Sequence, residues 1–147
     1  MFNLETAVNL VYNRILQEIG KVVSEDKEVG TTQSELNKAG QDAFGHLWGG
    51  CISLEQWPEI CHDSHRFFIM NTLSSSDIEE VGHWLAVHDG KIWDSFNRPL
   101  NQIIPKLKFA RPFTELIDLS ILPQPDSSTD CGERCIAALE LYKTLYH

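Results

Sequence analysis

The sequence has no apolar run long enough to cross a membrane. Spanning a bilayer takes roughly 20 consecutive apolar residues, and polar or charged residues interrupt every hydrophobic stretch of this 147-residue chain before that length. The N-terminus also lacks the basic segment followed by an apolar stretch that marks a secretory signal. We therefore expect a protein that is neither inserted in a membrane nor secreted.

Positive charge is also scarce. Twelve lysines and arginines stand against 21 aspartates and glutamates, so the net charge is −9 at pH 7. Such a balance is a poor electrostatic match to nucleic acid. The exception lies between Lys91 and Arg111, where five basic side chains stand against Asp94 alone. We interpret this stretch as a solvated helix face, with a local contact to an anionic group as the alternative.

Cysteine is infrequent, and its spacing does not indicate a metal site. The four cysteines are Cys51, Cys61, Cys131 and Cys135. In a chain without a secretory signal we expect free thiols rather than disulfides. Cys51, Cys61, His62 and His65 are potential zinc ligands, but their spacing differs from the close ligand pairs that build tetrahedral zinc sites. We therefore predict no bound metal.

Nucleotide-binding and serine-hydrolase motifs are missing as well. The sequence contains no P-loop, G-x-G-x-x-G or G-x-S-x-G pattern, so we expect no nucleotide cofactor. The composition, 42% hydrophobic and 22% charged, is that of an ordinary globular domain. We predict one domain over residues 1–147, with an N-terminal helix and linker over 1–30 and the main core over 31–147.

Hydrophobic periodicity predicts helices near both ends of the chain. Apolar residues recur at intervals of three and four over residues 4–19, which indicates an amphipathic helix that ends at Gly20. A second helix is expected from Thr32 to Leu47, and another from Gly132 to Tyr146. We expect Gly49-Gly50 to interrupt regular secondary structure after the second helix.

Shorter segments complete an α+β pattern. Residues 66–73 and 113–122 are expected to be strands, because they are short apolar runs bounded by polar segments. Leucine and isoleucine at helical spacing predict a helix over 98–108, although Pro105 interrupts it. The stretch 123–130, PQPDSSTD, fits neither element and is predicted to be an irregular loop.

One hairpin allows a geometric deduction about side chains. Aromatic and β-branched segments flank Asp89-Gly90, which strongly favours a two-residue type I′ turn. In that turn His88 pairs with Lys91, and His83 and Asp94 become diagonal neighbours on one face of the hairpin. A carboxylate beside an imidazole fixes the tautomer of the ring and stabilises the imidazolium. His83 and Asp94 are therefore candidates for general-base chemistry. The alternative is a histidine in a sheet that lies beside an aspartate without a functional connection.

Cys131 lies where an irregular loop meets a predicted helix. The N–H groups at a helix start favour a thiolate, which makes Cys131 a candidate nucleophile, with a small buried cysteine at a helix start as the alternative. Gly132 would allow a substrate backbone to approach closely, and Cys135, one turn later, is interpreted as a core residue. Gln124, seven residues before Cys131, has a side-chain amide that could donate one hydrogen bond to an oxyanion.

These motifs, taken in order, resemble a known family. They are FFIMNT at 67–72, Gly82-His83-Trp84, Trp93-Asp94-Ser95-Phe96 and QPDSSTDCGERC at 124–135. Their order and spacing resemble the adenovirus-type endopeptidases (adenain-like), cysteine proteases whose superfamily also holds the SUMO- and ubiquitin-like-specific proteases. Residues 31–58 are more weakly similar to the corresponding region of relatives from virophages and large DNA transposons.

The resemblance implies a fold and a role for each site residue. The fold would be α+β, a mixed sheet flanked by helices, with the nucleophile at the N-terminus of a central helix. Cys131 would be the nucleophile, His83 the general base and Asp94 the group that orients His83. Gln124 and the backbone N–H of Cys131 would form the oxyanion hole, and Trp84 would pack beside them.

The resemblance also implies an activity and a setting. The protein would be a cysteine endopeptidase without cofactor or metal, a viral maturation protease that cleaves capsid or other virion precursor proteins next to glycine. It would act in the virion and in the interior of the host cell. The chain departs from the adenovirus enzyme in three respects: it ends one helix after Cys131, it is acidic, and it shows no counterpart of the activating-peptide disulfide. We therefore do not expect a DNA cofactor, and we make no prediction about whether an activating peptide is needed.

Three other functions are compatible with the same residues. One is a deconjugating protease for a ubiquitin-like modifier, which needs a broad surface for a folded partner. Another is an acetyltransferase, which usually needs an additional cofactor-binding region. A third, from a different class, is a catalytically inactive interaction module.

Overall fold

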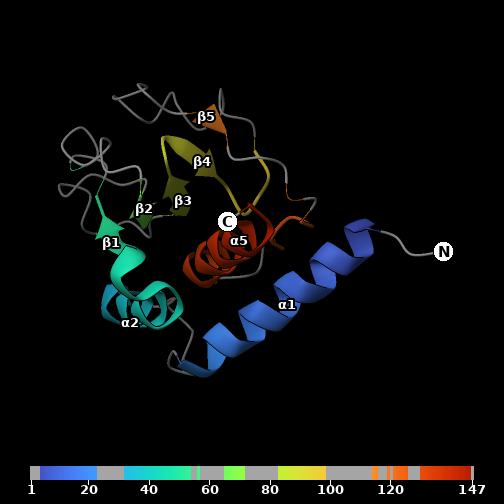
Figure 1. Cartoon of the computed structure of the whole chain (residues 1–147), viewed down its shortest axis with the longest axis horizontal. Helices are drawn as coiled ribbons and strands as arrows, with labels where there is room; N and C mark the ends of the chain where they lie inside the picture. Colours follow the sequence, from blue (N-terminus) through green and yellow to red (C-terminus); the bar gives the residue numbers. More distant parts are fainter. Residues whose placement is uncertain are drawn as a thin grey trace.

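The computed structural model describes residues 4–22, 32–53, 56, 65–71, 83–98, 114–115, 119, 121–125 and 130–146. Within these ranges the chain forms three α-helices and one mixed sheet, which confirms the predicted α+β class (Figure 1). The predicted helix over 98–108 lies almost entirely outside the described residues, as do Cys61 and His62.

Five strands form the sheet in the order in which they occur in the chain. They are β1 (Trp48–Ile52), β2 (Phe67–Asn71), β3 (Trp84–His88), β4 (Lys91–Trp93) and β5 (Thr114–Glu115). The three central strands pair antiparallel, whereas β1 runs parallel to β2 and β5 runs parallel to β4. The sheet is therefore mixed.

The hairpin between β3 and β4 has the predicted register. Asp89 and Gly90 both have positive φ, 50° and 71°, as a type I′ turn requires. His88 pairs with Lys91, and Ala86 pairs with Trp93. The turn thus brings the residue before β3 and the residue after β4 to the same end of the hairpin.

The expectation that Gly49-Gly50 interrupts regular secondary structure was wrong, because both residues lie within β1. A Cβ on Gly49 would lie 2.1 Å from a ring carbon of Phe68, so a glycine is needed for this ring to cover the strand. Gly50 has φ of 113°, at a point where the register between β1 and β2 shifts. The two glycines therefore serve close packing and a local irregularity in a strand.

The strand predicted over 113–122 is confirmed at β5 and wrong at its end. Of the residues described in this range, 114 and 115 form β5, whereas 119, 121 and 122 have no regular structure. Their backbone groups are bonded by side chains instead: the Ile121 carbonyl accepts from Asn97 Nδ2 at 2.9 Å, and the Leu122 N–H donates to Asn9 Oδ1 at 2.9 Å. These bonds satisfy backbone groups that, in a strand, would have bonded to the backbone of a neighbouring strand.

The three helices among the described residues differ from prediction at their ends. Helix α1 (Leu4–Val22) continues two residues past Gly20, and α2 (Gln33–Phe44) ends before a 3-10 turn over Gly45–Leu47. Thr32 caps α2 through a reciprocal capping box with Glu35. Helix α5 (Cys131–Tyr146) begins one residue earlier than predicted. No helix among the described residues is both long and apolar enough to cross a membrane.

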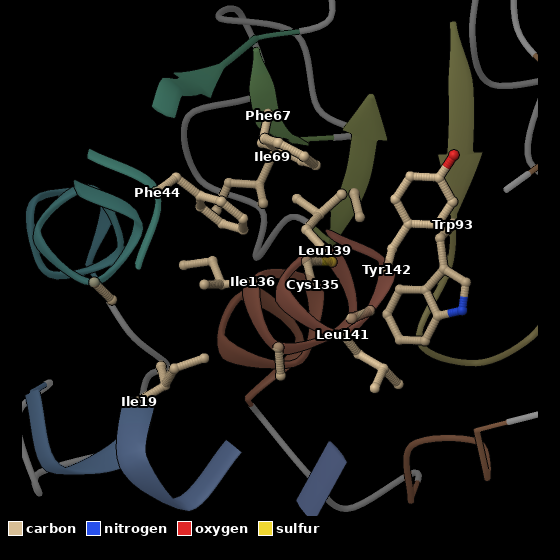
Figure 2. Close-up of a cluster of buried hydrophobic side chains, with 14 of the residues drawn as sticks. Ile19, Phe44, Phe67, Ile69, Trp93, Cys135, Ile136, Leu139, Leu141 and Tyr142 are labelled. Carbon is tan, nitrogen blue, oxygen red and sulfur yellow. The ribbon is translucent and has the colours of Figure 1, made fainter. Parts of the chain in front are cut away.

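Helix α5 is the centre of the core. It packs against α1, α2 and the strands β2 and β3, and Figure 1 shows it between the sheet and α1. Five consecutive residues of α5, Cys135–Leu139, are fully buried. Figure 2 shows the buried side chains gathered around α5, with Phe67 and Ile69 on one side and Ile19 on the other. Because α5 is enclosed in this way, the position of its first residue is set by the core.

We predict opposite effects for two helical glycine-to-alanine substitutions. At Gly40 in α2, a new Cβ would lie 2.2 Å from the buried Trp48 ring, so Gly40→Ala should lower the free energy of unfolding by about 1–3 kcal/mol. At Gly20 in α1 nothing lies within 4 Å of the new Cβ. Gly20→Ala should therefore raise stability by up to about 1 kcal/mol through helix propensity. Urea unfolding measures both, and equal effects would contradict the packing of Trp48 on α2.

Candidate active site

His83 and Asp94 meet at the open end of the hairpin, as the register predicts. His83 immediately precedes β3 and Asp94 immediately follows β4. The His83 ring is bonded through Nε2 to Asp94 Oδ1. The Asp94 side chain has no exposed surface, and that of His83 is 17% exposed. The carboxylate is thus enclosed, while the imidazole keeps one part accessible.

Asp94 is held by more than His83. Its Oδ2 accepts from Arg98 Nε at 2.6 Å, and the backbone N–H groups of Phe96 and Arg98 donate to its two oxygens at 3.3 and 3.4 Å. Burial alone would raise the pKa of Asp94, but the hydrogen bonds from His83 and Arg98 outweigh it and lower the pKa to about 2. Asp94 is therefore a carboxylate at neutral pH.

The role of Arg98 was missed by the sequence analysis, which interpreted the basic stretch from Lys91 as a solvated helix face. For Arg98 the structure favours the alternative, a contact to an anionic group, and the group is Asp94 of the same chain. The guanidinium also lies over the Phe96 ring, 5.4 Å from its centroid. The available signal was the i, i+4 spacing of an aspartate and an arginine.

Cys131 is the third member of the candidate site. It is the first residue of α5 and is partly exposed, and its thiol is hydrogen-bonded to the His83 ring. Because Nε2 of the ring is engaged by Asp94, Nδ1 is the ring nitrogen left to interact with the thiol. Burial lowers the pKa of His83, but the hydrogen bonds to Asp94 and Cys131 outweigh it and raise the pKa to about 9. At neutral pH the ring is therefore mostly an imidazolium.

Gln124 is fixed by Ser95, which directly follows Asp94. The Gln124 N–H donates to the Ser95 carbonyl at 2.7 Å, and the Ser95 hydroxyl donates to Gln124 Oε1 at 2.5 Å. Both side chains are buried. The hydroxyl of Ser95 thus fixes the orientation of the Gln124 amide through its oxygen. Ser95 belongs to the Trp93-Asp94-Ser95-Phe96 motif, but its position in the sequence did not indicate this contact with Gln124.

The other described cysteines differ in their surroundings. Burial raises the pKa of the Cys135 thiol well above its usual range, and the thiol donates to the Trp84 carbonyl at 3.2 Å. Burial also raises the pKa of Cys51 to about 12. Both are unreactive environments for a thiol. The interpretation of Cys135 as a core residue is confirmed, since it is fully buried.

Gly132 was expected to leave room for a substrate, and the structure gives it another neighbour. The residue is buried, and a Cβ there would lie 2.7 Å from Leu36 Cδ1 of α2. The glycine therefore allows α2 to pack closely on the first turn of α5. Cys131 is partly exposed beside it, at the end of a well-packed helix.

Metal-binding groups do not gather in the part of the chain that the structure describes. There, no three His, Cys, Asp or Glu side chains lie together so as to hold a metal ion. Two of the four potential zinc ligands, Cys61 and His62, lie outside this part.

Comparisons with known proteins return no match. A scan against protein-family models finds none, and searches of curated proteins and of solved structures find none either. The chemistry of the site is therefore inferred from its own residues: a partly exposed thiol, an imidazolium, a buried carboxylate and an oriented amide.

We predict that the His83 ring titrates near pH 9 and that Asp94→Asn lowers this pKa, because an amide still accepts a hydrogen bond but carries no charge. A raised pKa means that the imidazolium stabilises the fold fully below about pH 6.5 and that this contribution is lost as the pH rises through about 9. NMR titration of the histidine ring carbons, with His83→Gln to assign the signal, measures the pKa.

Asp89→Asn is the matched control for this titration. Asp89 lies exposed in the turn at the far end of the same hairpin, where asparagine also tolerates positive φ. The pKa of His83 should not change in this variant. A wild-type midpoint near 6.5, or equal midpoints in Asp94→Asn and wild type, would contradict the buried ion pair.

Proposed function

We propose that this protein is a cysteine endopeptidase. The observation that carries the proposal is that the His83 ring interacts with both the buried Asp94 carboxylate and the Cys131 thiol. A nucleophile, a base in contact with it and a third group that orients the base form the arrangement that nucleophilic acyl transfer needs. The start of α5 supports the same role, because the N-terminal end of a helix favours negative charge near Cys131.

Acylation begins when Cys131 attacks the scissile carbonyl as a thiolate, with the proton already on His83. The new carbon–sulfur bond gives a tetrahedral oxyanion, to which the Cys131 backbone N–H and Gln124 Nε2 donate. His83 then transfers its proton to the leaving nitrogen, and the carbon–nitrogen bond breaks. An imidazolium at neutral pH suits this step, since the proton for the amine is in place before attack.

Deacylation uses the same groups. His83, now neutral, takes a proton from water as the water oxygen attacks the thioester carbonyl. The carbon–sulfur bond breaks, the acid product leaves, and His83 again carries the proton opposite the thiolate. Asp94 stabilises each imidazolium form and is itself never protonated, in keeping with its low pKa of about 2.

The substrate class follows from the family resemblance. The motif order around His83, Asp94, Gln124 and Cys131 supports an adenain-like maturation protease that cleaves virion precursor proteins next to glycine within an infected cell or virion. A mixed sheet with the proposed nucleophile at the start of a core helix is compatible with that family. The net charge of −9 argues against DNA as a cofactor.

The direct test is cleavage of a defined peptide mixture that includes glycine on each side of many bonds, with new termini identified by mass spectrometry. We predict that wild type cleaves and that Cys131→Ala and His83→Ala each lose on the order of 10³-fold or more in rate. Cys51→Ala is the matched cysteine control and should retain full activity. Circular dichroism checks that each variant is folded.

Retention of a tenth of the activity by either variant would contradict the mechanism. Cleavage confined to an isopeptide-linked ubiquitin-like modifier would favour the deconjugating alternative. No cleavage of any substrate, with Cys131 no more reactive than Cys51, would favour an inactive module.

A second prediction concerns Gln124 and Ser95. Gln124→Ala should lower kcat on the order of 10²-fold with little change in KM, because the oxyanion exists only in the transition state. Ser95→Ala should lower kcat about tenfold, since it removes one hydrogen bond that orients the amide. Alkylation of Cys131 by iodoacetamide needs no oxyanion hole and should stay close to the wild-type rate in both.

A double-mutant cycle separates this role from general destabilisation. If Ser95 acts through Gln124, Ser95→Ala should have almost no further effect on kcat in a Gln124→Ala background. Ser34→Ala, at an exposed position of α2, is the control and should leave kcat unchanged. Full additivity of the two losses would show that Ser95 does not orient Gln124.

A further inference from the structure

Helix α1 contacts the segment that carries Gln124. The Leu122 N–H donates to Asn9 Oδ1 at 2.9 Å, and Leu122 is only two residues before Gln124. Asn9 Nδ2 donates in turn to the Glu5 carbonyl at 2.9 Å, one turn earlier in the same helix. The second bond directs the amide oxygen of Asn9 toward the Leu122 backbone.

The same face of α1 is anchored to α5, the helix that begins with Cys131. Tyr12, three residues after Asn9, is only 2% exposed and lies next to Arg134 of α5. Arg134 Nε donates to Asp130 Oδ1 at 2.8 Å, and the Arg134 N–H donates to the Asp130 carbonyl at 3.0 Å. Asp130 immediately precedes Cys131. Figure 1 shows α1 lying alongside α5.

The segment over 121–125 has no regular secondary structure, so its position depends on contacts with other elements: Ile121 is buried in the core, and the Gln124 N–H donates to the Ser95 carbonyl. On the sheet side, Ser95 and Asn97 hold Gln124 and Ile121. On the other side, the contact is with Asn9 of α1. Catalysis of the proposed kind needs the Gln124 amide at a defined distance from Cys131, and errors near 1 Å in such placements reduce rates strongly.

We propose that α1 is a built-in positioning element for the active site, an inference that rests on the proposed protease function. Tyr12 docks α1 on α5, and Asn9 binds the Leu122 backbone, so that the helix sets the position of Gln124 relative to Cys131. Asn9 is a positioning residue, because it acts through the 121–125 segment and does not contact the reacting atoms.

The test compares Asn9→Ala with Asn13→Ala in the full chain. Asn13 is an exposed asparagine of the same helix, so both variants gain the same helix propensity and only the first loses the Leu122 bond. We expect Asn9→Ala to lower kcat about fivefold with KM nearly unchanged, as for loss of one hydrogen bond. Asn9→Asp keeps the oxygen acceptor and should recover most of the loss.

Two further readouts separate positioning from a merely structural role. Alkylation of Cys131 should proceed at the wild-type rate in Asn9→Ala, and hydrogen exchange of the Leu122 N–H, followed by NMR, should be faster than in Asn13→Ala. A kcat for Asn9→Ala equal to that of Asn13→Ala would overturn the inference alone. If the wild type and Asn13→Ala both cleave no peptide, the proposed function fails. That outcome differs from one in which both cleave and Asn9→Ala cleaves equally fast, which overturns only the role of α1.

Discussion

A buried carboxylate is the constraint on which this structure depends. The Asp94 side chain is removed from water, and a charge in that position must be paired and fully hydrogen-bonded. His83, Arg98 and two backbone N–H groups meet this requirement. The hairpin must therefore hold its two ends together, and the His83 ring must present Nε2 to Asp94. The interaction between His83 and Asp94 raises the pKa of the first and lowers that of the second, with further contributions from Cys131 and Arg98.

The second half of the site depends on the core. Helix α5 is enclosed by α1, α2 and the sheet, and the absence of a side chain at Gly132 lets Leu36 of α2 pack against its first turn. Cys131 is thereby placed at the end of a rigid helix, beside the His83 ring. The irregular segment with Gln124 is anchored by Ile121, which is buried in the same core, and by bonds from Ser95 and Asn9. Core packing and hydrogen bonds therefore both position the residues of the candidate site.

Turn chemistry and strand register predicted the contact between His83 and Asp94, but they did not predict the contacts made by Ser95 and Asn9. Asp89-Gly90 determines the turn type, the turn determines the register, and the register places His83 beside Asp94. Ser95 and Asn9 were missed because their partners are distant in sequence and lie on a segment without periodicity. For the same reason, the strand expected over 113–122 was too long. Apolar residues there suggested a ladder, whereas side chains from other segments bond the backbone.

In the proposed mechanism, His83 and Asp94 make Cys131 a nucleophile. The rate of iodoacetamide alkylation, resolved by peptide mass spectrometry between pH 5 and 9, measures this activation. Cys51 is an internal reference, because it is also partly exposed but burial raises its pKa to about 12. Near pH 7, Cys131 should be labelled at least about tenfold faster than Cys51, and His83→Ala should remove most of this advantage. Equal rates for Cys131 and Cys51 in the wild type, or an unchanged advantage in His83→Ala, would contradict the account.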